Sequence, residues 1–167
     1  MTLAELNALP RDAAERELAR CCGSSSWAGA MAGRRPFRDE QHLFQAADET
    51  WWALSSPDWL EAFSHHPRIG ERAAGWARDE QAGTDSASDK IKDELVKWNA
   101  EYERRFGHVF LIYATSRKAD DMLEQMRLRM ENEKEAEIRI AATEQAKITR
   151  LRLDKLLSTS SEPARPG

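Results

Sequence analysis

Apolar side chains recur every three or four residues along most of the chain. In the segment 39–54 the repeating positions are Leu43, Phe44, Ala47, Trp51 and Leu54. The same period returns in four further segments, at about 10–23, 88–106, 116–130 and 132–157. Each stripe predicts an amphipathic helix with one face in a core. With shorter helical segments between them, the stripes predict an all-α fold: a single helical domain of about eight helices over residues 1–157, followed by a flexible tail over 158–167.

Residues that commonly cap helices stand at several of the expected boundaries. Thr2 and Glu5 have the spacing of a capping box, in which each side chain binds the other residue's backbone N–H. Ser26, Ser88 and Ser116 precede apolar stripes and are therefore the expected N-caps of three further helices.

One segment looks extended rather than helical. Residues 108–113 are short, aromatic and β-branched, which favours an extended backbone but is too little to anchor a sheet. A buried extended segment must find partners for its peptide groups outside itself. A bound polar ligand is one possible partner.

Composition narrows the class of protein. The chain has 167 residues, with 25 Lys and Arg against 29 Asp and Glu, which gives a net charge of −4. An acidic balance disfavours a nucleic acid as the partner, because such domains usually carry a basic face. No apolar run approaches the ~18 residues that a membrane helix needs, so no membrane partner is expected. The residues of the N-terminus do not read as a signal peptide, and a cytoplasmic location follows by default.

The cysteines and histidines show no metal-ligand spacing. Cys21 and Cys22 are adjacent, where a disulfide would be strained, so both are expected to be free thiols in a reducing compartment. His65, His66 and Glu71 lie close in sequence, but not at the spacings of known metal sites. The sequence therefore predicts no metal.

The stretch from His65 to Glu71, His-His-Pro-Arg-Ile-Gly-Glu, concentrates groups that can carry chemistry. Pro67 stops the preceding helix and restrains the backbone of His66. Imidazole can give or take a proton near neutral pH, which makes His66 a candidate general acid or base. The alternative is a surface loop with incidental charge.

Two further residues qualify as site candidates. Glu80 follows on a short helix, close to Trp76, and a carboxyl group beside an indole can be partly desolvated, which favours its acid form. Gln81 beside it offers a donor and an acceptor to a planar polar ligand. Arg152 lies on the apolar stripe of the last helix, where a guanidinium calls for an anion. The alternatives are an exposed helix glutamate and an arginine whose stem lines the core edge while its head reaches water.

Four motifs in this order resemble a known family. They are His66-Pro67-Arg68-Ile69-Gly70-Glu71, Glu80-Gln81-Ala82-Gly83, the run from Asn99 through Phe106-Gly107-His108 to Ile112, and Ile148-Thr149-Arg150-Leu151-Arg152-Leu153. As a set they resemble the family of 2-oxo-4-hydroxy-4-carboxy-5-ureidoimidazoline (OHCU) decarboxylase. The resemblance implies an all-helical homodimer without a cofactor, a carboxy-lyase of urate degradation that forms (S)-allantoin and CO2 from OHCU.

The resemblance also assigns roles to residues. It implies His66 and Glu80 as catalytic residues and Arg152 as the residue that grips the substrate. The expected substrate-binding residues are Pro67, Gln81, Phe110, Leu111 and Ile112. Ala77 departs from the serine that many relatives carry three residues before the glutamate.

A non-enzymatic protein is the alternative. A dimeric helical binding or regulatory module would account equally well for the six tryptophans and for the long last helix. It gives no reason for His66, Glu80 and Arg152 to converge on one site.

Overall fold

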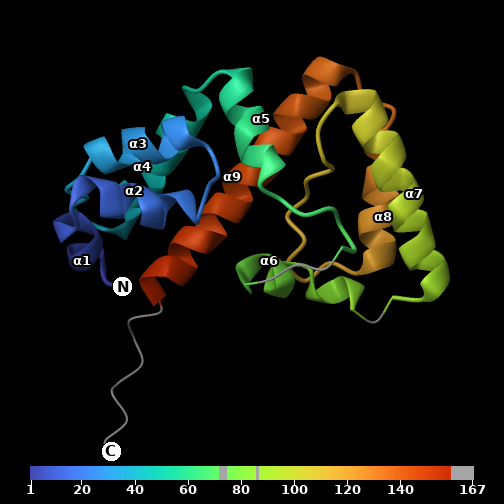
Figure 1. The fold of residues 1–167 in the computed structure, drawn as a ribbon, viewed down its shortest axis with the longest axis horizontal. Helices are drawn as coiled ribbons and strands as arrows, with labels where there is room; N and C mark the ends of the chain where they lie inside the picture. The colour runs from blue at the N-terminus through green and yellow to red at the C-terminus, as the bar shows by residue number, and fades with distance from the viewer. Residues whose placement is uncertain (72–74, 86, 159–167) are drawn as a thin grey trace, which may run out of the picture. The chain divides into compact units, whose positions relative to one another are not determined.

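The computed structural model describes residues 1–71, 75–85 and 87–158, and these residues form helices and connections without a strand. They contain nine α-helices and one 3₁₀ turn, labelled in Figure 1: α1 (Leu3–Ala8), α2 (Arg11–Ala19), α3 (Ser25–Gly33), α4 (Glu40–Trp52), α5 (Ser56–Ser64), α6 (Gly75–Glu80), η1 (Ala82–Thr84), α7 (Asp89–Phe106), α8 (Ala119–Arg129) and α9 (Lys134–Ser158). The predicted all-α class is confirmed. None of the helices in these ranges combines the length and the apolar character needed to cross a bilayer.

The chain divides into two compact units. Unit 1 comprises Met1–Asp58 and Ala146–Gly167, and unit 2 comprises Trp59–Gln145, so the boundaries fall inside α5 and α9. The single domain predicted for residues 1–157 stays a prediction. Ser158 is still part of α9, and the remainder of the expected tail, 159–167, lies outside the described residues.

Unit 1 is a helical cluster in which α3 packs against both α2 and α4. The Trp27 indole is fully buried and donates a hydrogen bond to the carbonyl oxygen of Ala47 at 3.2 Å, so this core side chain also connects α3 to α4. Cys21 and Cys22 are buried free thiols, as predicted. Burial raises the pKa of Cys21 to about 12, which keeps this thiol protonated at neutral pH.

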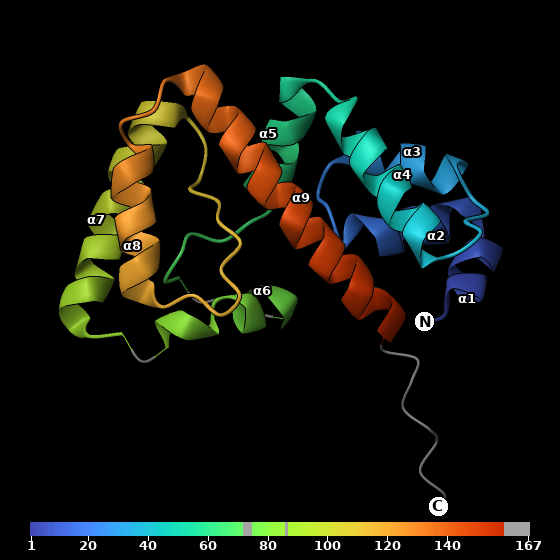
Figure 2. The same cartoon turned by 180° about the vertical axis from the view of Figure 1, so that it is seen from behind.

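In unit 2, α7 and α8 lie side by side and run in the same direction (Figures 1 and 2). Two parallel helices cannot be joined by a tight turn, so residues 107–118 return along them as an extended connection. This explains why one helical protein contains a buried extended segment. The core of unit 2 joins this segment to α7 and α8. Its buried residues are Ile69, Leu95, Tyr102, Phe110, Ile112, Ala114, Ala119, Met122, Leu123 and Met126.

Two of the four predicted caps are confirmed and two are wrong. Thr2 and Glu5 form the capping box of α1, and the Ser88 hydroxyl accepts from the N–H of Ile91 at the start of α7. The cap of α3 is Ser24 instead of Ser26, whose hydroxyl donates to the side chain of Asp58. Ser116 caps no helix, because it has a left-handed backbone (φ +65°) in the turn before α8.

Gly83 sits where no side chain fits. A Cβ atom at this position would run into the backbone carbonyl of Arg117, which belongs to the connection before α8. We expect Gly83→Ala to lower the free energy of unfolding by about 1–3 kcal/mol, because backbone must shift to admit the methyl group.

The matched control is Gly29→Ala in α3, where the nearest atom to the new Cβ is 3.9 Å away. This variant should gain about 0.5–1 kcal/mol from reduced chain entropy in the unfolded state. Urea unfolding followed by circular dichroism measures both. Equal stability of the two variants would contradict the close approach at Gly83.

Candidate active site

The His66 loop begins where α5 ends. The backbone N–H groups of His65 and His66 still bond to the carbonyls of Ala62 and Phe63, and Pro67, which has no N–H, then ends the turn. The His66 ring is half-buried, and its Nε2 lies 2.6 Å from Oε1 of Gln145 on α9. The imidazole therefore has a fixed partner from a distant part of the sequence. This contact favours a preorganised site over a surface loop with incidental charge.

Two buried amide side chains hold the next part of the loop. Asn99 on α7 donates to the carbonyl oxygen of Ile69 at 2.9 Å. The N–H of Gly70 donates to Oε1 of Gln81 at 3.2 Å. Gly70 has φ +90°, a conformation that glycine adopts without strain. The loop is thus attached to α7 on one side and to the residue after α6 on the other.

The charged residues of the loop pair with one another and with α7. Arg68 contacts Glu103 at 2.7 Å and Glu71 at 3.1 Å. These hydrogen bonds raise the pKa of the arginine further, and the bond to Glu103 has the larger effect. The three side chains are partly exposed, so the pairs contribute little to stability and serve to orient the loop. Among the described residues no group of three or more His, Cys, Asp or Glu gathers into a possible metal site.

Glu80 is the last residue of α6, and its side chain is only 7% exposed. Glu80 is therefore a buried residue and not the exposed helix glutamate of the alternative, while its catalytic role stays a prediction. Gln81 is buried to a similar extent, and its side-chain oxygen is already engaged by Gly70. The side-chain nitrogen of Gln81 is the part of the amide that can still serve a ligand, as a donor.

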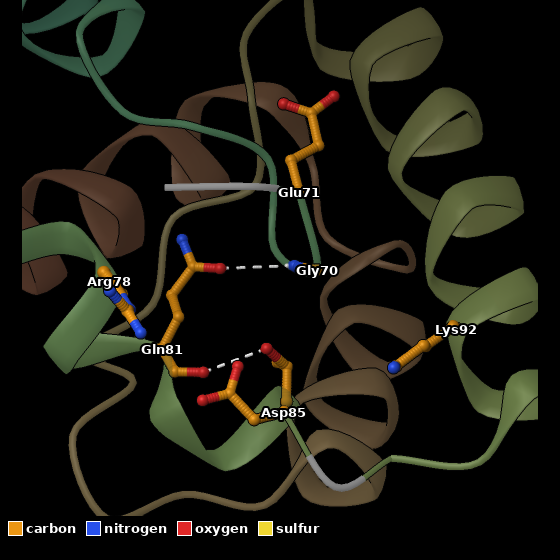
Figure 3. A pocket seen from close by; sticks show the side chains of 7 residues that line it. Gly70, Glu71, Arg78, Gln81, Asp85 and Lys92 are labelled. Atoms are coloured by element: carbon orange, nitrogen blue, oxygen red, sulfur yellow. Dashed lines mark hydrogen bonds between the residues drawn. The ribbon is translucent and has the colours of Figure 1, made fainter. Parts of the chain in front are cut away.

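A hollow of about 410 Å³ opens beside Gln81 (Figure 3). Its described lining includes Gln81 but neither His66 nor Glu80, and Arg78 and Lys92 enter it from opposite sides. The remaining lining residues are Gly70, Glu71, Thr84 and Asp85. Two cations and two carboxylates share the hollow, so its charge alone does not favour an anion.

The extended segment is buried, with its side chains in the core of unit 2. Phe110, Leu111 and Ile112 are at most 4% exposed. The carbonyl oxygen of Leu111 accepts from Arg129 at 2.8 Å, so it is already satisfied by the protein. The binding of a ligand by the peptide groups of Phe110 and Ile112 stays a prediction.

A buried polar network that the sequence patterns did not reveal supports this segment. Arg129 on α8 donates to Glu137 on α9 at 2.7 Å, and the guanidinium lies over the Phe110 ring at 4.4 Å. Glu137 also accepts from the hydroxyl of Tyr102 at 2.6 Å and from the side chain of Asn132 at 3.0 Å. The sequence does contain a signal for this network. Arg129 follows the apolar Met126 by three positions, so a charged residue lies on the apolar face of the helix.

Arg152 belongs to unit 1, where it is half-buried on α9. Its charge acts on the buried thiol of Cys21, lowering a pKa that burial raises more strongly. The guanidinium of Arg152 therefore lies within electrostatic range of the buried Cys21. His66 and Glu80 belong to unit 2, and the joint action of the three residues stays a prediction.

The sequence profile of the OHCU decarboxylase family matches residues 7–154. The chain belongs to the OHCU decarboxylase family. It is 36% identical over 157 residues to the uric acid degradation bifunctional protein TTL of Arabidopsis thaliana, and the match covers 89% of the chain but only 48% of that protein. It is 29% identical to the mouse 2-oxo-4-hydroxy-4-carboxy-5-ureidoimidazoline decarboxylase, covering 83% of the chain and 82% of the mouse protein. The chain thus spans about half the length of the plant relative.

The fold agrees with two solved structures. A crystal structure of OHCU decarboxylase in the presence of (S)-allantoin superposes with a TM-score of 0.79 at 38% identity, over 85% of this chain and 97% of the other. A crystal structure of (S)-allantoin synthase reaches a TM-score of 0.73 at 18% identity, over 94% of this chain and 54% of the other, which shows likeness of fold alone.

Proposed function

We propose that this chain decarboxylates OHCU to (S)-allantoin in urate degradation. The observation that carries the proposal is the family match over residues 7–154. The half-buried His66 with a fixed partner and the buried Glu80 support it, because they supply two proton-transfer groups within one compact unit. Family membership also favours an enzyme over the non-enzymatic helical module.

The substrate chemistry sets what the protein must supply. Breaking the bond to the carboxylate releases CO2 and leaves an electron pair on the ring carbon that carries the hydroxyl group. The adjacent ring C=N accepts this pair, so the substrate is its own electron sink and no cofactor is expected. The hydroxyl carbon then becomes a carbonyl, and one proton must reach one face of the neighbouring carbon. Selective delivery of this proton gives a single enantiomer of allantoin.

The residues divide these tasks. Arg152 binds an anionic or carbonyl edge of the substrate through its planar guanidinium. His66 and Glu80 exchange protons with the hydroxyl group and the ring. Pro67 restrains His66, while the Gln81 side chain and the peptide groups of Phe110 to Ile112 bind the polar edges of the ring.

We propose in addition that the chain works in the cytoplasm as a homodimer. Its buried, protonated Cys21 suits a reducing compartment. Two apolar side chains of unit 2 are exposed, Val96 on α7 at 72% and Leu128 on α8 at 57%, and contact with a second copy would bury them.

The stereochemistry of the product tests the proposed activity. When freshly generated OHCU is added, we expect its decay to accelerate and the allantoin formed to show the circular dichroism of the (S)-enantiomer. The control is the same mixture without protein, in which decay is slow and the product is racemic. Unaccelerated decay with racemic product would contradict the proposed activity.

A further inference from the structure

Gln145 is a polar residue on the apolar stripe of α9, and its side chain is fully buried. It lies 79 positions from His66 in the sequence, yet its Oε1 is 2.6 Å from Nε2 of that ring. A buried amide in the core costs free energy unless its polar atoms are satisfied. A hydrogen bond to the candidate catalytic histidine therefore suggests a role beyond packing.

The identity of the two atoms fixes the form of the ring. An amide oxygen only accepts hydrogen bonds, so Nε2 of His66 must carry the hydrogen. In the neutral ring the lone pair is then on Nδ1, which becomes the basic atom. The orientation of the amide thus selects one of the two tautomers.

The neutral charge of Gln145 has a second consequence. Nε2 carries a hydrogen in the neutral ring and in the imidazolium alike, so this bond persists when Nδ1 gains or loses a proton. A carboxylate in the same place would favour the imidazolium, whereas an amide orients the ring without adding charge. Among the charged residues close in sequence, Arg68 pairs with Glu71 and Glu103, and Glu144 accepts from the N–H of Tyr113.

We propose that Gln145 is a positioning residue that holds His66 in the Nε2–H form, so that Nδ1 exchanges the proton with the substrate. The catalytic part of this inference rests on the proposed function, while the tautomer does not. The two parts are therefore tested by separate measurements.

Nitrogen NMR identifies the tautomer of the His66 ring in the absence of substrate. Long-range ¹H–¹⁵N spectra at a pH where the ring is neutral should show a protonated Nε2 and an unprotonated Nδ1 for His66, whose signals are assigned by their loss in His66→Gln. In Gln145→Met, which keeps the side-chain volume but lacks the acceptor, the two nitrogen shifts should move towards each other as the tautomers mix. The matched control is Gln125→Met, at a half-buried position on α8 of the same unit. A protonated Nδ1 in the wild type, or unchanged shifts in Gln145→Met, would overturn the inference.

Steady-state kinetics measure how the Gln145 contact affects catalysis. Gln145→Met should lower kcat about tenfold, the size of one net hydrogen bond, with KM within about twofold of the wild type. Gln145→Glu keeps an acceptor, so it should retain most activity and move the pH profile upwards by about one pH unit or more, since a carboxylate favours the imidazolium. A wild-type kcat and pH profile in both variants would overturn the positioning role. A wild-type protein that fails to accelerate OHCU decay would instead refute the proposed function, and the NMR result would stand.

Discussion

His66→Gln is expected to lower the rate of OHCU decarboxylation by about 10²–10⁴-fold, the usual contribution of a positioned acid–base group. Glutamine can still hydrogen-bond to Gln145, so the loop should keep its position while the titratable group is lost. The rate is measured as the decay of freshly generated OHCU. Any remaining product should be closer to racemic than that of the wild type, because one proton is no longer delivered to a single face.

The neighbouring histidine provides the control. His65 is exposed and precedes His66 directly, so His65→Gln makes the same chemical change one residue away. Its rate should stay within about twofold of the wild type, because a surface substitution rarely affects a site that it does not touch. A loss of similar size in both variants would refute the role of His66 and point to damage of the loop as a whole.

The helices could be predicted because their signal is local. The stripe from Leu43 to Trp51 and the cap at Ser88 depend on residues within a few positions of one another, and both appear as expected. The caps at Ser26 and Ser116 were wrong for the same reason. A serine caps a helix only in the right backbone conformation, and the left-handed φ of Ser116 is set by the turn after the extended segment.

The site could be predicted only in part, because its supports come from distant segments. The motif around His66 and the burial of Glu80 could be expected from neighbouring residues. The contact of His66 with Gln145 could not, since it depends on how α9 packs in unit 2. In the sequence, Gln145 is one polar member of an otherwise apolar stripe. The periodicity of the stripe predicts that Gln145 is buried, but it does not identify the hydrogen-bond partner.

The Arg129 network is where a single substitution should cost the most stability. Removing the guanidinium in Arg129→Met leaves the carboxylate of Glu137, which is fully buried, without its cation. We expect the free energy of unfolding to fall by about 3–5 kcal/mol, the usual cost of breaking a buried ion pair from one side. Urea unfolding followed by circular dichroism at 222 nm measures this loss.

The same substitution on the surface of α8 provides the control. Arg127 pairs with Glu94 at 3.0 Å, but its side chain is 41% exposed, so Arg127→Met should cost less than about 1 kcal/mol. Removing the stranded carboxylate as well, in Arg129→Met combined with Glu137→Met, should restore part of the loss. Equal stability of Arg129→Met and Arg127→Met would show that Arg129 does not stabilise the buried charge of Glu137. Because Arg129 also holds the carbonyl of Leu111, the buried pair links the stability of unit 2 to the backbone proposed to bind the substrate.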